Sequence, residues 1–327
     1  MRIGLLNELR TSFFYKMKIS ITGCCGFIGS HLTEYLSRHY DHEILGIDNM
    51  TEDESNRKEE NLAILHQLDR FQFEKADICN TPSIERWRPD IVVHLAGLAG
   101  VRNSIACPEK YIYNNVFGHS YLLKESIKYH VKKFIYASSS SVYGSNVKKP
   151  FKEEDPIRDL KSPYALSKWT CEKMSEIYSK NSNSTEIIGC RFFSVYGPRG
   201  RPDMAPLKFL QKIKNDQVIE VNGDGFQERD FTYIDDVIQC LSKIIHSGHT
   251  FDLILNVGYG QPIKILMLIS ILEELLQKKA RVRFLPGNEL DAPITHCDTK
   301  KLIYSLDYIP HVNIKMGLQK MIDYYDA

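Results

Sequence analysis

Three evenly spaced glycines, Gly23, Gly26 and Gly29, are the feature that most restricts the possible fold of this chain. They directly follow residues 18–22, whose pattern predicts a strand, and apolar positions at helical spacing begin at residue 27. Glycines at a strand-to-helix turn let backbone amides and the helix N-terminus approach a pyrophosphate without a side chain in the way. A mere tight turn is the alternative, but this placement favours a dinucleotide-binding loop.

Strand-like segments alternate with helical or mixed stretches along the first 190 residues. Further strands are predicted at residues 43–47, 71–75, 91–95, 133–137 and 186–190. The nearly continuous apolar run at residues 91–95 is typical of a sheet that is covered on both faces. Because strands and helices alternate, we predict an α/β fold with a Rossmann-type doubly wound parallel sheet.

The alternation breaks after about residue 191 into loops rich in glycine and proline, such as residues 196–202. We therefore predict a dinucleotide-binding Rossmann domain over residues 17–190 and a smaller C-terminal α/β domain over residues 191–327. The second domain is expected mainly to bind substrate, with some of its segments returning to the first domain. Residues 1–16 are an extension that lacks the uninterrupted apolar stretch of a secretory signal.

Composition excludes several classes of partner. The chain has 42 Lys+Arg against 41 Asp+Glu, whereas phosphate-backbone binding usually leaves a basic excess, so no nucleic acid is expected. The longest apolar run, residues 263–276, is interrupted by three charged residues, so no membrane span is expected. The eight cysteines form no Cys-x-x-Cys pair, which favours free thiols in a reducing cytoplasm and predicts no metal site.

Asp48 ends the second predicted strand, 19 residues beyond Gly29. A carboxylate at this place can accept both hydroxyls of the adenine ribose and repels a 2′-phosphate, so NAD is favoured over NADP as cofactor. Asp77 follows the third strand. The sequence leaves two roles open for it, a cap for a helix that begins near Thr81 and a contact to adenine.

A second cluster of polar residues follows the fifth strand. Tyr164 and Lys168 are spaced i and i+4, so they share one face of a predicted helix, and Ser139 lies at the end of the strand. A free phenol is a poor base at neutral pH, but a neighbouring ammonium and a cationic nicotinamide both favour its phenolate form. Ser139 can relay or orient the proton of an alcohol substrate. A solvated helix face is the alternative for the Tyr–Lys pair.

Five motifs carry a resemblance to the extended short-chain dehydrogenase/reductase family over residues 17–320. The first two are Ser139-Ser140-Ser141-Val142-Tyr143-Gly144 and Tyr164-Ala165-Leu166-Ser167-Lys168, and the others are residues 94–102, 191–204 and 229–236. Within that family the chain resembles the nucleotide-sugar epimerases, and its long run at residues 191–204 is similar to that of enzymes that act on UDP-glucuronate. The resemblance implies NAD-dependent conversion of UDP-glucuronate to UDP-galacturonate through a 4-keto intermediate.

The resemblance also implies roles for particular residues. Tyr164 is the base, Lys168 is its partner and a nicotinamide-ribose ligand, and Ser139 is the third catalytic hydroxyl. Arg229 faces the nucleotide diphosphate, and Arg102 belongs to the substrate-binding set. The expected cofactor contacts are the pyrophosphate with Gly23, Gly26, Phe27, Ile28 and Gly29, the adenosine ribose with Asp48 and Asn49, the adenine with Asp77 and Ile78, and the nicotinamide half with Leu95, Ala96, Ala99 and Asn115.

A 4-keto uronate is a β-keto acid that loses carbon dioxide when its carboxylate bond aligns with the carbonyl π-system, so an epimerase has to hold the carboxylate. Hydroxyl and guanidinium donors can do so, and the candidates are Ser140, Ser141, Ser194 and Arg201. Turn hydrogen bonds are the alternative for the serines, and a surface charge is the alternative for Arg201.

Other functions remain open from the sequence. A 4-epimerase for a neutral UDP-hexose or a UDP-glucuronate decarboxylase would share most of these residues, and a non-catalytic NAD-binding regulator or scaffold would share the fold. Dehydratases of the family place Asp-Glu where this chain has Ser140-Ser141, which disfavours dehydration. A homodimer is expected, with residues 111–129 and 162–178 as its seam, as in relatives.

Overall fold

The computed structural model describes residues 16–51, 57–146, 148–182, 184–248, 250–251, 253–288 and 290–326. Of the predicted extension 1–16, only Lys16 lies within this part of the chain. In the described residues, no helix is both long enough and apolar enough to cross a bilayer.

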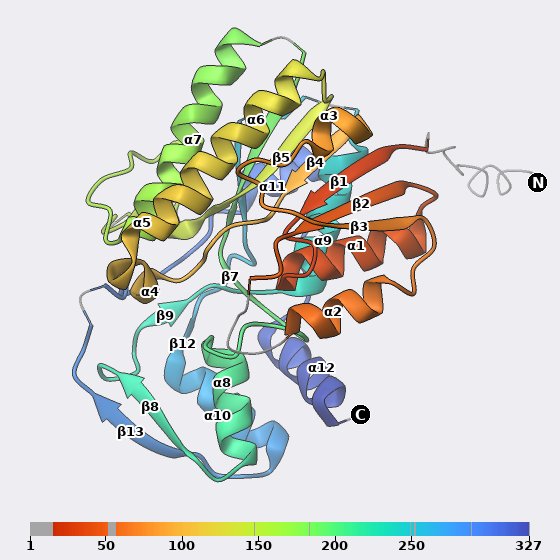
Figure 1. The fold of residues 1–327 in the computed structure, drawn as a ribbon. Helices are drawn as coiled ribbons and strands as arrows, with labels where there is room; N and C mark the ends of the chain where they lie inside the picture. The colour runs from red at the N-terminus through yellow and green to blue at the C-terminus, as the bar shows by residue number, and fades with distance from the viewer. Residues whose placement is uncertain are drawn as a thin grey trace, which may run out of the picture.

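A seven-stranded sheet forms the centre of the molecule, with the strand order β11-β6-β5-β4-β1-β2-β3 (Figure 1). All of its neighbouring strands are parallel. The strands are β1 (Lys18–Thr22), β2 (Glu43–Asp48), β3 (Phe71–Lys75), β4 (Ile91–His94), β5 (Lys133–Ser139), β6 (Glu186–Phe192) and β11 (Ile254–Val257). The doubly wound sheet is confirmed, and each of the six predicted strands is present.

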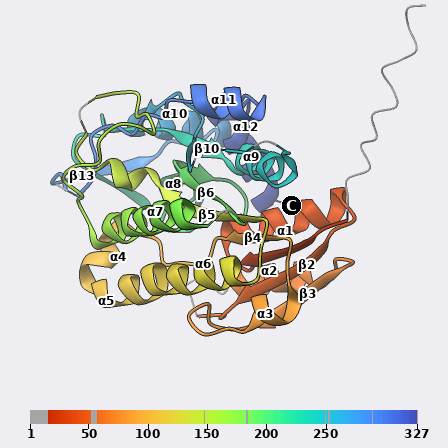
Figure 2. The ribbon, with the colours of Figure 1, turned by 90° about the horizontal axis from the view of Figure 1, so that it is seen from above.

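Helices cover both faces of this sheet, as the view from above shows (Figure 2), and further helices belong to the smaller domain described below. In chain order they are α1 (Phe27–His39), α2 (Arg57–Leu65), α3 (Ser83–Trp87), α4 (Val101–Ala106), α5 (Pro108–Tyr111), the π-helix η1 (Ile112–Phe117), α6 (Gly118–Lys128), the 3₁₀ turn η2 (Ser140–Tyr143), α7 (Pro163–Asn181), α8 (Ala205–Lys214), α9 (Ile234–His246), α10 (Ile265–Leu276), α11 (Lys300–Leu306) and α12 (Ile314–Asp326).

Alternation along the central strands divides the core into two layers. On β5, Ile135 packs in the cluster that contains residues of α1 and α9. Its neighbours Phe134 and Tyr136 pack in the cluster with Leu122 of α6 and Cys171 of α7. Because successive side chains of a strand point to opposite faces, an apolar strand of this kind needs helices on both sides.

The smaller domain consists of short strand pairs and helices that lie beyond the carboxyl end of the sheet (Figure 1). The pairs are β7 (Ser194–Tyr196) with β10 (Phe231–Tyr233), β8 (Val218–Asn222) with β13 (Arg281–Leu285), and β9 (Glu228–Arg229) with β12 (Ile263–Lys264). Between these elements the chain returns to the main sheet as β11, whose Ile254 pairs with Gly189 of β6. We propose the division near residue 190, with β11 as a returning segment of the second domain.

Candidate functional site

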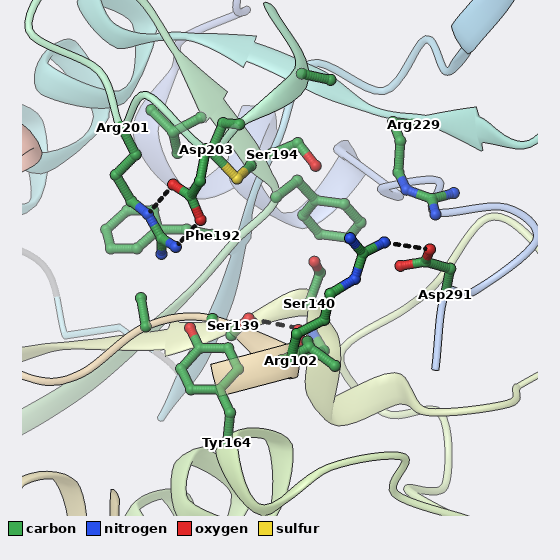
Figure 3. A pocket seen from close by; sticks show the side chains of 18 of the residues that line it. Arg102, Ser139, Ser140, Tyr164, Phe192, Ser194, Arg201, Asp203, Arg229 and Asp291 are labelled. Carbon is green, nitrogen blue, oxygen red and sulfur yellow. Dashed lines mark hydrogen bonds and ion pairs between the residues drawn. The ribbon is translucent and has the colours of Figure 1, made fainter. Parts of the chain in front are cut away.

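A cavity of about 690 Å³ lies where the carboxyl end of the sheet meets the smaller domain. In an open parallel sheet this edge is where ligands bind. Its wall includes the ends of β5 and β6, the helices α4 and α7, and loops of the smaller domain (Figure 3). The cavity therefore brings together segments that are more than one hundred residues apart in the sequence.

The glycine loop between β1 and α1 forms a cradle that side chains would fill. Gly23 has a φ of +70°, and a Cβ there would lie 2.7 Å from the backbone nitrogen of Ala96. A Cβ on Gly29 would lie 2.1 Å from the carbonyl oxygen of Gly23. Gly26 is the N-cap residue of α1 and offers no side-chain cap, and no acidic residue lies in the first turn of the helix. The loop thus fits a pyrophosphate at the positive end of the helix dipole.

Two buried thiols lie directly in this loop. Cys24 and Cys25 are fully buried, and their Sγ atoms are 3.7 Å apart. The hydrogen bond from Cys25 and burial raise the pKa of the Cys24 thiol well above its usual value. Together with the Asp48 carboxylate, they place three possible metal-ligand atoms within 4.8 Å of one another. The same Asp48 is the predicted ribose ligand, so this group belongs to the cofactor region.

Asp48 ends β2 and is 4% exposed. Its Oδ2 accepts a hydrogen bond from the Cys25 amide at 3.2 Å, and its Oδ1 accepts from Lys58 Nζ at 2.9 Å and from the Met50 amide at 3.0 Å. Lys58 is a neighbour that the sequence pattern did not reveal. The neighbouring Asn49 uses its side-chain oxygen in a turn, where it accepts from the Thr51 amide at 3.0 Å.

Asp77 forms a turn and does not cap a helix. Its Oδ1 accepts a hydrogen bond from the Cys79 amide at 2.9 Å, while α3 begins only at Ser83, after Pro82. The alternative of a cap for a helix near Thr81 is therefore wrong. Ile78 is buried and packs close to Gly118: a Cβ added at Gly118 would lie 2.6 Å from Cδ1 of Ile78.

The residues predicted to contact the nicotinamide half of NAD lie in or against the loop after β4. Leu95 and Ala99 line the cavity, and the Ala96 amide donates to Thr22 Oγ1 at 3.3 Å. The Asn115 side chain accepts from the Leu98 amide at 2.7 Å and donates to the Leu98 carbonyl and to Ser167 Oγ, each at 3.0 Å. Since its amide group is used in these bonds, Asn115 fixes the loop against α7.

The three predicted catalytic groups all line the cavity (Figure 3). Tyr164 and Lys168 lie on α7, whose first turn is capped by Ser162 and begins with a proline. Lys168 Nζ donates to the carbonyl oxygen of Ala137 at 2.9 Å. Ser139 caps η2 by accepting a bond from the Ser141 amide at 3.1 Å, which leaves its hydroxyl hydrogen free to donate.

A buried ion pair joins α7 to the sheet. Arg191 of β6 donates to Glu172 of α7 through Nε at 2.9 Å and Nη2 at 2.8 Å, and Ser138 Oγ donates to the same carboxylate at 2.5 Å. Arg191 also donates to the Tyr143 hydroxyl at 2.9 Å. Burial opposes the charge of Arg191, but Glu172 outweighs it, so the pKa of the guanidinium is raised. Sequence analysis did not identify Glu172.

The predicted substrate-binding residues also meet in the cavity, whose lining contains Arg102, Ser140, Ser141, Ser194, Arg201 and Arg229. Two of the arginines have carboxylate partners that were not predicted. Arg102 Nη2 lies 2.9 Å from Asp291 Oδ2, and Arg201 forms two bonds to Asp203. Arg229 donates to the Glu228 carbonyl at 2.8 Å. The Arg201-Pro202-Asp203 spacing was a possible signal, whereas Asp291 lies 189 residues from Arg102.

Comparisons with known proteins agree with this geometry. The model of the NAD dependent epimerase/dehydratase family matches residues 19–258. The chain is 35% identical to UDP-glucuronate 4-epimerase of Thermodesulfobacterium geofontis, over 93% of this chain and 94% of that protein.

Two solved structures are also similar to this chain. The crystal structure of UDP-glucuronic acid 4-epimerase from Bacillus cereus with UDP-glucuronic acid and NAD is 36% identical, with a TM-score of 0.88, and the match covers 95% of this chain and 99% of that one. UDP-glucose 4-epimerase from Thermotoga maritima with UDP-glucose is 29% identical, with a TM-score of 0.85 and coverage of 95% and 99%.

Proposed function

The chain belongs to the NAD dependent epimerase/dehydratase family, and from this premise we propose that it converts UDP-glucuronate to UDP-galacturonate by NAD-dependent 4-epimerisation. One observation carries the choice of a uronate substrate. Arg201, Ser140 and Ser194 line the same cavity as Tyr164. The cavity that holds the proposed base therefore also offers hydrogen-bond donors to the carboxylate of a uronic acid.

NAD would be held by the glycine loop at its pyrophosphate and by Asp48 at its adenine ribose, with Leu95 and Ala99 near the nicotinamide. The chemistry that bound NAD supplies is reversible hydride transfer at C4, which takes the sugar through a 4-keto intermediate. The Asp48 carboxylate, which already accepts three protein hydrogen bonds, adds negative charge where NADP would carry its 2′-phosphate.

The chain's own residues handle the proton of the 4-hydroxyl. Tyr164 removes it as the sugar is oxidised and returns it to the oxygen when the keto sugar has turned over. Lys168 is 8% exposed and is fixed by its bond to the Ala137 carbonyl, so its ammonium stays beside the base. Ser139 keeps a free hydroxyl hydrogen with which to orient the substrate oxygen. Arg229 and Arg102 supply positive charge for the diphosphate.

The serines and Arg201 hold the carboxylate of the uronate. The pKa of Arg201 is raised, because Asp203 outweighs the effect of burial, so the guanidinium stays charged at the pH of the reaction. Ser140, Ser141 and Ser194 add neutral donors around it. A carboxylate bound by several donors cannot rotate freely, and this limits the loss of carbon dioxide from the keto intermediate.

The alternatives are less compatible with these residues. A neutral UDP-hexose would leave Arg201 without an anionic ligand in the sugar site, and dehydration would need carboxylic acids where the chain has Ser140 and Ser141. A regulator without activity would not need Ser139, Tyr164 and Lys168 together.

We also propose that the enzyme is a homodimer. Large apolar side chains are more than 40% exposed on the predicted seam, namely Ile112, Tyr113 and Phe117 on η1 and Leu166 and Ile177 on α7. Ile105 on α4, just before the seam, is exposed to a similar degree. Exposed apolar side chains on neighbouring segments are typical of an interface. All eight cysteines are free thiols, which agrees with a cytoplasmic site of action.

The decisive experiment is incubation of the protein with UDP-glucuronate and NAD, with products resolved by chromatography and mass. We expect a product of unchanged mass that co-elutes with UDP-galacturonate. A lighter product would identify a decarboxylase. Unchanged UDP-glucuronate together with turnover of UDP-glucose would overturn the proposed substrate, and loss of every activity with retained NAD binding would indicate a regulator.

A further inference from the structure

We propose that Asp203 is a positioning residue: it fixes the guanidinium of Arg201 so that the substrate carboxylate is held where it cannot leave as carbon dioxide. The inference rests on the proposed function and concerns its outcome, the ratio of epimer to decarboxylated product. Asp203 lines the cavity on the same loop as Arg201, at the start of α8 (Figure 3).

The contacts show how Arg201 is oriented. Asp203 Oδ1 accepts from Nε at 3.0 Å, and Oδ2 accepts from Nη2 at 2.5 Å. This bidentate pair uses one edge of the planar guanidinium and leaves the Nη1 hydrogens and one Nη2 hydrogen for a ligand. The two terminal nitrogens are directed toward the side of the cavity where the Tyr164 hydroxyl lies (Figure 3).

The backbone at Gly100 also lies close to the guanidinium of Arg201. Gly100 has a φ of +116°, and a Cβ there would lie 3.3 Å from Arg201 Nη2. The guanidinium thus packs against a backbone segment that carries no side chain. After Asp203, nearby Tyr164 and Tyr111 also help to raise the pKa of Arg201.

The pair contributes little to folding. The side chain of Arg201 is 33% exposed and that of Asp203 is 58% exposed. Ion pairs at such exposure have little effect on the free energy of unfolding, because water screens them. A fixed guanidinium matters more for its direction, since a preorganised donor does not have to be ordered when substrate binds.

The direction matters because of the chemistry of the 4-keto uronate. Decarboxylation breaks the C5–C6 bond, its electron pair forms an enolate with the C4 carbonyl, carbon dioxide leaves, and C5 then takes up a proton. Return of the hydride to C4 gives a UDP-pentose. The bond breaks easily only when it stands perpendicular to the carbonyl plane. A guanidinium held by Asp203 keeps the carboxylate in another orientation.

The test uses Asp203→Ala, Asp203→Asn and Asp203→Glu in the full-length enzyme with NAD. UDP-glucuronate labelled at C6 is the substrate, and released labelled carbon dioxide is compared with UDP-galacturonate. We expect Asp203→Ala and Asp203→Asn to raise the decarboxylated fraction by about tenfold, the scale of one or two charge-assisted hydrogen bonds. Asp203→Glu retains a carboxylate and should keep most of the wild-type ratio.

Asp291→Ala is the matched control, because it breaks the other Arg–Asp pair of the cavity. It should change KM for every UDP-sugar alike and leave the product ratio at its wild-type value. Thermal unfolding of each variant should stay near that of the wild type, which separates positioning from folding. A wild-type ratio in Asp203→Ala would overturn the positioning role alone. A wild-type enzyme that leaves UDP-glucuronate unchanged would overturn the proposed function as well.

Discussion

The side chains of Glu172 and Arg191, which join α7 to β6, are each 5% exposed, whereas in the Arg102–Asp291 pair, which lines the cavity, they are 55% and 33% exposed. The first pair belongs to what we call the sheet wall, formed by β5, β6 and α7 with Ser139, Tyr164 and Lys168. The second belongs to the arginine wall, formed by Arg102, Arg201, Asp203 and Asp291.

The difference in burial separates two tasks. In the sheet wall Glu172 and Arg191 have short, buried bonds to each other, so removing one partner leaves a desolvated charge and disturbs the packing of α7. In the arginine wall water reaches both partners of the Arg102–Asp291 pair, so Arg102 can exchange Asp291 for another anion at low cost. Under the proposed function, chemistry depends on the buried sheet wall, and recognition of the substrate depends on the more exposed arginine wall.

The strongest test of this comparison is Tyr164→Phe. The substitution removes only the hydroxyl of the base, so kcat should fall by roughly three orders of magnitude. NAD binding and KM should change little, since the ring and its edge contact with Tyr111, at a centroid distance of 6.1 Å, remain. Steady-state kinetics with a fluorescence titration of NAD measure both effects. Near-normal turnover would show that Tyr164 is not the base.

Next in size is Glu172→Ala. It leaves the buried Arg191 without its carboxylate, and we expect the free energy of unfolding to fall by about 3–5 kcal/mol. Glu176→Ala on the same helix is the control. Its carboxylate pairs with exposed Lys173 and Lys180, so the substitution should cost less than about 1 kcal/mol. Urea unfolding compares the two. Equal losses would contradict the distinction between the walls.

Acid should weaken the sheet wall through His119. Burial, and then the charge of Lys168, lower the pKa of His119 to about 3, and its ring is bonded to Ser175 of α7. In the unfolded chain the residue takes a proton near pH 6.5, whereas the folded protein does not. Stability is therefore lost as the pH falls below 6.5, by about 1.4 kcal/mol for each unit. Unfolding at pH 7.5 and 5.5 should show a smaller loss for His119→Gln than for the wild type.

The smallest effect is expected in the arginine wall. Asp291→Asn removes a carboxylate that competes with the diphosphate for Arg102, so KM for UDP-sugars should fall a few-fold while kcat stays constant. The change should shrink at high salt, because the pair is exposed to solvent. Initial rates at two salt concentrations measure it. A fall in kcat would show that Asp291 supports the sheet wall instead.

The sequence predicted the parts of the molecule that depend on local pattern. The glycine loop, the six strands and the Tyr164–Lys168 pair can each be recognised from a short stretch of sequence. The strand pairs of the smaller domain were not predicted. β9 and β12 have two residues each, which is too short to show a period, and β13 alternates polar and apolar residues but is largely exposed. Partners such as Asp291 were missed because only folding brings them to their arginines.

The return of the chain to the main sheet as β11 has a consequence for how such enzymes diversify. Without β11, which lies next to β6, the strand that carries Arg191 would become an open edge. The proposed substrate-binding domain therefore cannot be exchanged between relatives as one continuous piece of gene without taking this strand out of the sheet. Changes within its loops leave the covering strand in place.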